Sequence, residues 1–262
     1  MISQIHTLFS RLEMPRSHRI SAALLGAMAL AGSIGAVEAR AASLSVDTFD
    51  VPTVPDFQFV ESTGSGSDFE EAGAFAGSDV LGGFRDLNIS ILNSAPPFAS
   101  ASGTVFDGRL DWSNDNNVIS ELTVAWDGND GSAAVNATGL GGIDLTQGGL
   151  LDRFGLQLLA ADSPGLTVAF TVYTAENLFS TLTRTFDSAI NAPQQEFFEF
   201  ANFTGNADFT NVGAVTLSLT GPAAMDASIA LLDVTEPPNS VPEPSAIFGL
   251  AVLGGAIALR RR

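Results

Sequence analysis

Short runs of alternating apolar and polar residues, separated by clusters of Gly, Asn and Asp, recur through residues 42–234. In residues 86–92, Leu87, Ile89 and Ile91 are spaced two apart, so in a strand their side chains would lie on one face. The same spacing is expected to turn Leu166, Val168, Phe170 and Val172 inward. The Gly, Asn and Asp clusters favour the tight turns that join antiparallel strands. A strand with one apolar face must bury it against a second layer, so the pattern predicts an all-β domain of antiparallel β-sandwich or jelly-roll type.

Most expected strands follow from this alternation, and one segment remains open. Residues 150–161 suit either a helix or a strand, since Gly155 would interrupt a helix. Residues 61–83 are rich in Gly, Ser and acids, which indicates a loop. A slip in the alternation near Ser120 suggests a β-bulge. Strands are expected at residues 44–50, 57–60, 86–92, 103–110, 118–126, 165–173, 178–186, 196–200, 214–219 and 227–234.

Residues 1–41 have the parts of a secretory signal peptide. Arginines precede an uncharged stretch, residues 20–37, which is rich in Ala, Leu and Gly and is followed by small residues that suit a signal peptidase. We therefore expect residues 1–41 to be removed on export, with an N-terminal transmembrane anchor as the alternative. A start at Met14 would give a leader of conventional length.

The C-terminal end of the sequence has three parts: a Pro-rich lead, an apolar run over residues 246–259, and three arginines. A helix over the apolar run would cover about 21 Å of a hydrocarbon core roughly 30 Å thick, and terminal arginines extend such a helix by reaching the headgroups. We expect a membrane helix with its arginines on the cytoplasmic side, with a buried helix as the alternative. The lead is Val241, Pro242, Glu243, Pro244 and Ser245, and the basic terminus is Arg260, Arg261 and Arg262.

This order of a Val-Pro-Glu-Pro-Ser lead, an apolar run and an arginine cluster resembles the PEP-CTERM sorting signal of bacterial surface proteins. The resemblance covers residues 241–262 only. It implies processing by an exosortase-type membrane protease, after signal peptidase has removed the leader. The product would be anchored transiently in the inner membrane and then reach the cell surface or the extracellular space. Residues 235–245 would form a Pro-rich linker with the motif, between the β domain (42–234) and the hydrophobic helix with its arginine cluster (246–262).

Charge and residue content limit the chemistry of the exported domain. Of the 29 acidic residues, 26 lie in residues 42–241, against four arginines and no lysine. Such a surface repels nucleic acid, so no nucleic-acid partner is expected. The chain has no cysteine, and both histidines, His6 and His18, fall in the leader. Ser-His-Asp, Cys-His and Schiff-base catalysis and histidine zinc sites are therefore excluded, which leaves a carboxylate-based glycosidase as the enzymatic alternative.

Two acidic loops offer the oxygen ligands that calcium prefers. In the first, Asp127, Asn129 and Asp130 are interleaved with glycines, although the spacing does not match an EF-hand. The second covers residues 111–115. Asn, Asp and Gly are also ordinary turn residues, so both loops suit plain turns as well as a calcium site, and no cofactor other than calcium is suggested.

Trp112 and Trp126 lie next to these loops in the sequence. A place in the core is the favoured interpretation for both, and the alternative is that exposed aromatic rings beside Asp and Asn form a platform for sugar rings. The sequence thus predicts a non-catalytic structural or binding protein of the cell surface or extracellular polymer matrix. A calcium-dependent module that binds extracellular polysaccharide or acts in adhesion is the alternative, and a glycosidase comes third.

The C-terminal motif generates a direct prediction. Replacing Pro242, Glu243 and Pro244 together with alanine should leave the protein in the membrane fraction, because the processing protease would no longer find the motif that it reads. Immunoblots of the membrane and released fractions measure this. Normal release of the variant would show that the motif does not direct processing.

Overall fold

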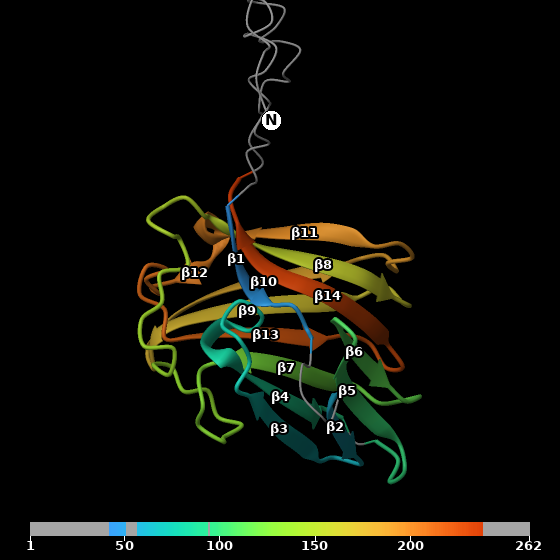
Figure 1. Ribbon diagram of the computed structural model, residues 1–262. Helices are drawn as coiled ribbons and strands as arrows, with labels where there is room; N and C mark the ends of the chain where they lie inside the picture. Colours follow the sequence, from blue (N-terminus) through green and yellow to red (C-terminus); the bar gives the residue numbers. More distant parts are fainter. Residues whose placement is uncertain (1–41, 51–56, 94, 238–262) are drawn as a thin grey trace, which may run out of the picture. The chain divides into compact units, whose positions relative to one another are not determined.

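The computed structural model describes residues 42–50, 57–93 and 95–237. Within these ranges the chain forms two antiparallel seven-stranded sheets, which pack face to face as a β-sandwich (Figure 1). The leader, the Pro-Glu-Pro motif and the C-terminal apolar run lie outside the described residues. None of the described segments forms a helix long and apolar enough to cross a membrane.

Both sheets are built from strands that are distant in sequence. Sheet A contains β1 (Ser43–Asp47), β2 (Gln58–Thr63), β5 (Ser100–Phe106), β6 (Arg109–Asn114), β8 (Arg153–Ala161), β11 (Gln194–Glu199) and β14 (Asp226–Thr235). Sheet B contains β3 (Ser67–Gly73), β4 (Phe84–Ile91), β7 (Ser120–Trp126), β9 (Leu166–Ala175), β10 (Leu178–Phe186), β12 (Thr204–Gly205) and β13 (Ala214–Thr220). The spatial order is β11-β8-β14-β6-β5-β2 in sheet A, with β1 paired to β14, and β12-β10-β9-β13-β7-β4-β3 in sheet B. Two short 3-10 turns are η1 (Leu81–Gly83) and η2 (Phe200–Asn202).

Alternation along each strand separates a core face from an outer face. On β9, Leu166, Val168, Phe170 and Val172 are fully buried, as the sequence predicts. The ring of Phe170 stacks on that of Phe154 from β8, with centroids 4.8 Å apart, and so joins the two sheets. The predicted antiparallel β-sandwich is therefore confirmed for the described part of the chain.

The prediction of a loop over residues 61–83 is wrong, because β3 lies within it. β3 pairs with β4 along its whole length, from Ser67 opposite Ser90 to Gly73 opposite Phe84. As the edge strand of sheet B, β3 keeps its polar and charged side chains in contact with water, so its composition resembles that of a loop. Pairing with a neighbour, rather than intrinsic preference, holds this strand in place.

In two further segments, turns and strand pairing determine where the strands begin and end. Residues 103–110, expected as one strand, are divided by a hairpin turn in which Asp107 and Gly108 have φ of 51° and 73° and join β5 to β6. Residues 150–161, left open between helix and strand, contain β8, which lies between β11 and β14. Interstrand hydrogen bonds on both sides therefore determine the structure of this segment.

The bulge expected near Ser120 is absent from β7. Ser120 lies opposite Ile91 in regular register, and its side chain is buried. Its hydroxyl accepts a hydrogen bond from Trp112 Nε1 and donates to Asn114 Oδ1. An inward-facing polar residue interrupts the hydrophobic pattern without changing the register, so the sequence suggested a slip that does not occur.

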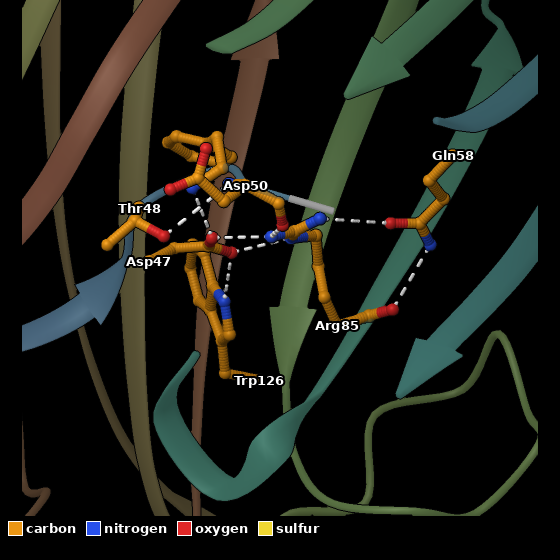
Figure 2. A network of polar contacts seen from close by, with 7 residues as sticks. Asp47, Thr48, Asp50, Gln58, Arg85 and Trp126 are labelled. Carbon is orange, nitrogen blue, oxygen red and sulfur yellow. Dashed lines mark hydrogen bonds and ion pairs between the residues drawn. The ribbon is translucent and has the colours of Figure 1, made fainter. Parts of the chain in front are cut away.

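A buried ion pair links the two sheets (Figure 2). Arg85 on β4 donates from Nε and Nη2 to the two carboxylate oxygens of Asp47 at the end of β1, each at 2.6 Å, and neither side chain is exposed. Trp126 on β7 donates from Nε1 to Asp47 Oδ2 at 2.8 Å. Gln58 on β2 accepts from Arg85 Nη1 at 3.4 Å and donates to the Arg85 carbonyl at 3.2 Å. The network connects two strands of each sheet.

Removal of one partner of this pair is expected to be costly. Asp47→Leu would leave the Arg85 charge buried without a counter-ion, and should lower the free energy of unfolding by about 3–5 kcal/mol. Adding Arg85→Met to it should recover much of that loss, because no unpaired charge would remain. Urea unfolding of the two single variants and the double variant measures this. Strictly additive losses would contradict the account.

Candidate functional site

The outer face of sheet B carries rows of hydroxyl groups. Alternation turns most Thr and Ser residues of β9, β10 and β13 away from the core, although Ser180 is buried, and the antiparallel register places the outward ones side by side. Thr181, Thr171 and Thr216 form one such row across the three strands. We call this surface the hydroxyl face, and its residues are Thr123, Thr167, Thr171, Thr181, Thr183, Thr185, Thr216, Ser218 and Thr220.

Hydrogen bonds between neighbouring hydroxyls hold these rows in place. In each bonded pair one hydroxyl donates, and both oxygens keep lone pairs that can accept from a ligand or water. No charged residue occupies an outward position on β9, β10 or β13. The bonded pairs are Thr167 with Thr185 (2.9 Å), Thr171 with Thr181 (3.1 Å) and Thr123 with Ser218 (3.1 Å).

Two aromatic rings stand at the end of the hydroxyl face where β9 turns into β10. Tyr173 and Phe179 are paired across these strands, with ring centroids 5.7 Å apart and planes inclined by 41°. Phe179 is 46% exposed. Burial raises the pKa of the Tyr173 hydroxyl, against a hydrogen bond with Thr216 that lowers it, so the hydroxyl stays neutral. The two rings give the face an apolar edge.

A hollow of about 300 Å³, lined by residues 135–138 and Glu176, lies beside this aromatic edge. The loop after β7 can approach the sheet because Gly213 has no side chain, since a Cβ there would lie 2.1 Å from the Ala137 carbonyl oxygen. Gly213 N–H donates to the carbonyl oxygen of Tyr173 at 2.7 Å. The loop therefore forms a wall next to the aromatic pair.

Carboxylates gather on the same outer face, where β3 and β4 meet the loop after β7. Glu71 and Asp86 are paired across β3 and β4, and one oxygen from each lies within 4.8 Å of the other and of an Asp130 oxygen. Glu71 Oε2 accepts from two backbone N–H groups of the loop, at 3.0 and 2.8 Å. Asp127 Oδ2 accepts from Asn136 N–H at 2.7 Å. We call Glu71, Asp86, Asp127 and Asp130 the acid cluster.

Two members of the acid cluster are shielded from water, whereas Glu71 is half-buried and Asp130 is exposed. Asp86 is 4% exposed and Asp127 is 1% exposed. Burial, followed by the neighbouring charge of Asp127 and a hydrogen bond with its carboxyl, raises the pKa of Asp86 to about 8, with smaller contributions from Glu71 and Asp130. Burial also raises the pKa of Asp127, although the hydrogen bond from Asn136 opposes this. Without a bound cation, the cluster therefore keeps a proton near neutral pH.

The predicted calcium ligands are only partly brought together. Asp127 and Asp130 belong to the acid cluster, whereas Asn129 is exposed at the surface. Glu71 was missed because residues 61–83 were expected to be a loop. Asp86, in the strand expected at residues 86–92, was missed because the cluster depends on the pairing of β3 with β4. The signal that could have indicated these two residues is an acidic side chain at an outward position on each of two consecutive strands. Calcium binding itself stays a prediction.

The structure rules out a sugar platform of Trp112 and Trp126 and confirms the favoured interpretation that both lie in the core. Both side chains lie in the core, at 1% and 0% exposure. Trp112 Nε1 donates to Ser120 Oγ at 2.9 Å, and Trp126 Nε1 donates to Asp47 Oδ2 at 2.8 Å. Because each indole N–H has a buried acceptor, these large rings can occupy inward positions without leaving a polar group unpaired.

A larger hollow, of about 540 Å³, lies on sheet A. Residues 111–113 of the second segment considered for calcium line it, but they belong to strand β6 and not to a loop. The lining of the hollow contains Asp111, Asp162 and Asp226. Asp111 accepts from Arg109 Nε at 2.9 Å and from Ser228 Oγ at 2.6 Å, and Asp162 Oδ1 accepts from Asp226 N–H at 3.0 Å. These acidic side chains therefore help to hold β6, β14 and the end of β8 together.

Comparisons with known proteins give similarity to solved structures only. No protein-family model matches the sequence, and no curated protein matches it. A family 11 carbohydrate-binding module from Clostridium thermocellum, in complex with a β-1,3-1,4-mixed-linked tetrasaccharide, aligns with 75% of this chain and 96% of its own, at 8% identity and a TM-score of 0.37. TmCBM61, in complex with β-1,4-galactotriose, aligns with 64% of this chain and 88% of its own, at 10% identity and a TM-score of 0.30. An agarase aligns over 64% of this chain and 25% of its own, at 10% identity and a TM-score of 0.39. At these TM-scores the similarity does not bear on function.

Asp86 generates a prediction for the cation-free protein. Its pKa rises from an ordinary value of 3.8 to about 8 on folding, so folding takes up a proton between these values. Its stabilising contribution is therefore present at low pH and is lost as pH rises through about 8, by at most about 1.4 kcal/mol per pH unit.

Thermal melts in chelator between about pH 5 and 9, with Asp86→Asn as the comparison, measure this effect. The native protein should lose more stability with rising pH than the variant, whose amide does not titrate. Parallel pH profiles would contradict the assigned pKa shift of Asp86.

Proposed function

We propose that the chain is an exported, non-catalytic module that binds neutral polysaccharide at the bacterial cell surface or in the extracellular polymer matrix. The observation that carries this proposal is the hydroxyl face, with Tyr173 and Phe179 at its end. One partly exposed surface there combines uncharged hydrogen-bonding groups with an apolar aromatic edge.

The chemistry of the hydroxyl face complements that of a sugar chain. Sugars carry hydroxyl groups around the ring and C–H groups on its faces. Thr and Ser hydroxyls both donate and accept, so they can pair with sugar hydroxyls without any charged group. An aromatic ring supplies a rigid apolar surface for the C–H face. Because strand pairing fixes these groups before a ligand arrives, little side-chain freedom is lost on binding.

Charge favours a neutral polymer over an acidic one. The chain has a formal net charge of −18, so an anionic polysaccharide would be repelled at low and moderate salt. The outward positions of β9, β10 and β13 carry no charge to attract or repel a ligand. Specificity would then come from hydrogen bonds and ring contacts.

The proposed location rests on the sequence of the two ends of the chain. The leader supports export and cleavage by signal peptidase. The resemblance of residues 241–262 to the PEP-CTERM signal supports recognition by an exosortase-type enzyme and transient anchoring in the inner membrane. A module delivered in this way would meet the polysaccharides that surround the cell.

The carboxylates in the two candidate regions suit binding better than hydrolysis. A glycosidase needs two carboxyl groups that reach the scissile bond from either side. In the larger hollow Asp111 and Asp162 are engaged in hydrogen bonds to neighbouring strands. In the acid cluster Asp86 and Asp127 are almost inaccessible. We therefore place a glycosidase behind the binding function.

Aromatic substitutions test the proposal. A glycan array with the mature chain should identify a neutral polysaccharide ligand, and calorimetry should then give its affinity. Tyr173→Ala or Phe179→Ala should each weaken binding by about tenfold, because a ring contact of this kind contributes on the order of 1 kcal/mol.

Phe106→Ala is a matched control for these variants. Phe106 is 46% exposed, as is Phe179, but it lies on β5 of sheet A. A blank array of neutral polysaccharides, or equal weakening by the control, would count against the hydroxyl face. A purely structural role in the matrix would then be the better account.

A further inference from the structure

We propose that the acid cluster is a binding site for one divalent cation, with calcium as the best match to its ligands. The site would comprise carboxylate oxygens of Glu71, Asp86, Asp127 and Asp130. The inference depends on the described contacts of these residues and holds whether or not the chain binds polysaccharide.

Buried carboxylate oxygens in the cluster receive no N–H or hydroxyl hydrogen bond from the described residues. Asp86 is 4% exposed, and neither of its carboxylate oxygens accepts such a bond. Asp127 is 1% exposed, and its Oδ1 likewise accepts none there. The side chains of Asp86 and Asp127 are within hydrogen-bonding reach of each other, but two ionised carboxylates are both acceptors. Buried polar groups in native proteins are nearly always hydrogen-bonded or bound to an ion, because leaving them unsatisfied is costly. Three buried oxygens that receive no donor from the chain therefore indicate a cation.

Three carboxylates of the cluster lie close enough to hold one ion. One oxygen from each of Glu71, Asp86 and Asp130 lies within 4.8 Å of the other two. Oxygens that share one calcium ion, each at about 2.3–2.6 Å, lie at most about 5 Å apart. The three groups are therefore close enough to share a single ion. They come from β3, β4 and the loop after β7.

No positively charged side chain in the described part of the chain forms an ion pair with the acid cluster. The chain has no lysine, and among the residues that the structure describes no arginine forms an ion pair with the cluster. Each arginine there is paired with other acids instead. The pairs are Arg85 with Asp47, Arg109 with Asp111, Arg153 with Asp152 and Glu199, and Arg184 with Glu196.

The chemistry of the ligand atoms in the cluster favours calcium over other metals. The donors are carboxylate oxygens, which are hard ligands that suit calcium, whereas zinc and copper favour nitrogen and sulfur donors. Loop carbonyls and water can complete the six to eight oxygens that calcium takes. Magnesium demands a smaller, near-octahedral shell and should bind less well to groups spread over two strands and a loop. Calcium sites of extracellular modules have dissociation constants of about 10⁻⁴–10⁻³ M, and we expect this range here.

A bound cation would connect the sheet to the loop that borders the hydroxyl face. Asp127 and Asp130 flank Gly128, whose φ of 91° and close approach to Gly139 exclude a side chain. Asp127 also accepts from Asn136, which lines the hollow beside the aromatic pair. An ion held by Asp86 and Asp130 would therefore fix the shape of this wall.

Calcium binding to the mature chain, purified and treated with chelator, tests the proposal. Calorimetry with calcium chloride should show one site, and saturating calcium should raise the melting temperature by about 3–8 °C. Magnesium at the same concentration should give a smaller shift. No binding and equal melting temperatures in calcium and chelator would overturn the proposal, and an equal shift with magnesium would overturn the assignment to calcium.

Two variants and a control identify the residues. Asp86→Asn should weaken calcium binding at least tenfold while melting in chelator at or above the temperature of the native protein. Asp130→Asn changes an exposed residue, so it tests the same site without disturbing a buried group. Asp187→Asn is the control. It removes one exposed charge just after the C-terminal end of β10 and should leave binding unchanged. Equal weakening by Asp187→Asn would mean that calcium binds only to the general acidic surface.

Discussion

The buried ion pair between Arg85 and Asp47 ties the two sheets of the sandwich to each other. It is bidentate, inaccessible to solvent, and shared by β1, β2, β4 and β7 through Trp126 and Gln58. A buried charge is tolerated only when a partner neutralises it and hydrogen bonds satisfy its remaining donors. Any arrangement of the sheets that separates these two groups would therefore leave a charge buried without its partner.

The next residue of β4 shows the opposite situation. Arg85 points into the core, is completely buried and is paired with Asp47, whereas Asp86 points to the outer face, is 4% exposed and receives no N–H or hydroxyl hydrogen bond within the described chain. Its carboxyl lies beside that of Asp127, another acid. Two adjacent residues of one strand thus place a compensated charge inside the sandwich and a carboxyl without a positively charged partner beneath a loop. We relate the second group to the proposed cation site.

Much of the fold followed from the sequence, because alternation along a strand is a local property. Leu166, Val168, Phe170 and Val172 were placed in the core by their spacing alone. The candidate site could not be found in this way, since it depends on which strands become neighbours. Glu71 meets Asp86 only because β3 pairs with β4, and the hydroxyl rows exist only because β9, β10 and β13 align in register. The sequence favoured a core position for Trp112 and Trp126 but could not exclude a sugar platform, because the buried acceptors of their N–H groups come from other strands.

The central claim is that the outer face of sheet B is the functional face, with a cation at the acid cluster and sugar on the hydroxyl face. Amide nuclear magnetic resonance of the mature chain, titrated with calcium and then with a neutral oligosaccharide, tests it most directly. The account predicts calcium-dependent shifts at Glu71, Asp86 and residues 127–138, and sugar-dependent shifts around Thr171, Tyr173 and Phe179. Sugar-dependent shifts around the hollow of sheet A, or calcium effects spread over the whole acidic surface, would contradict it.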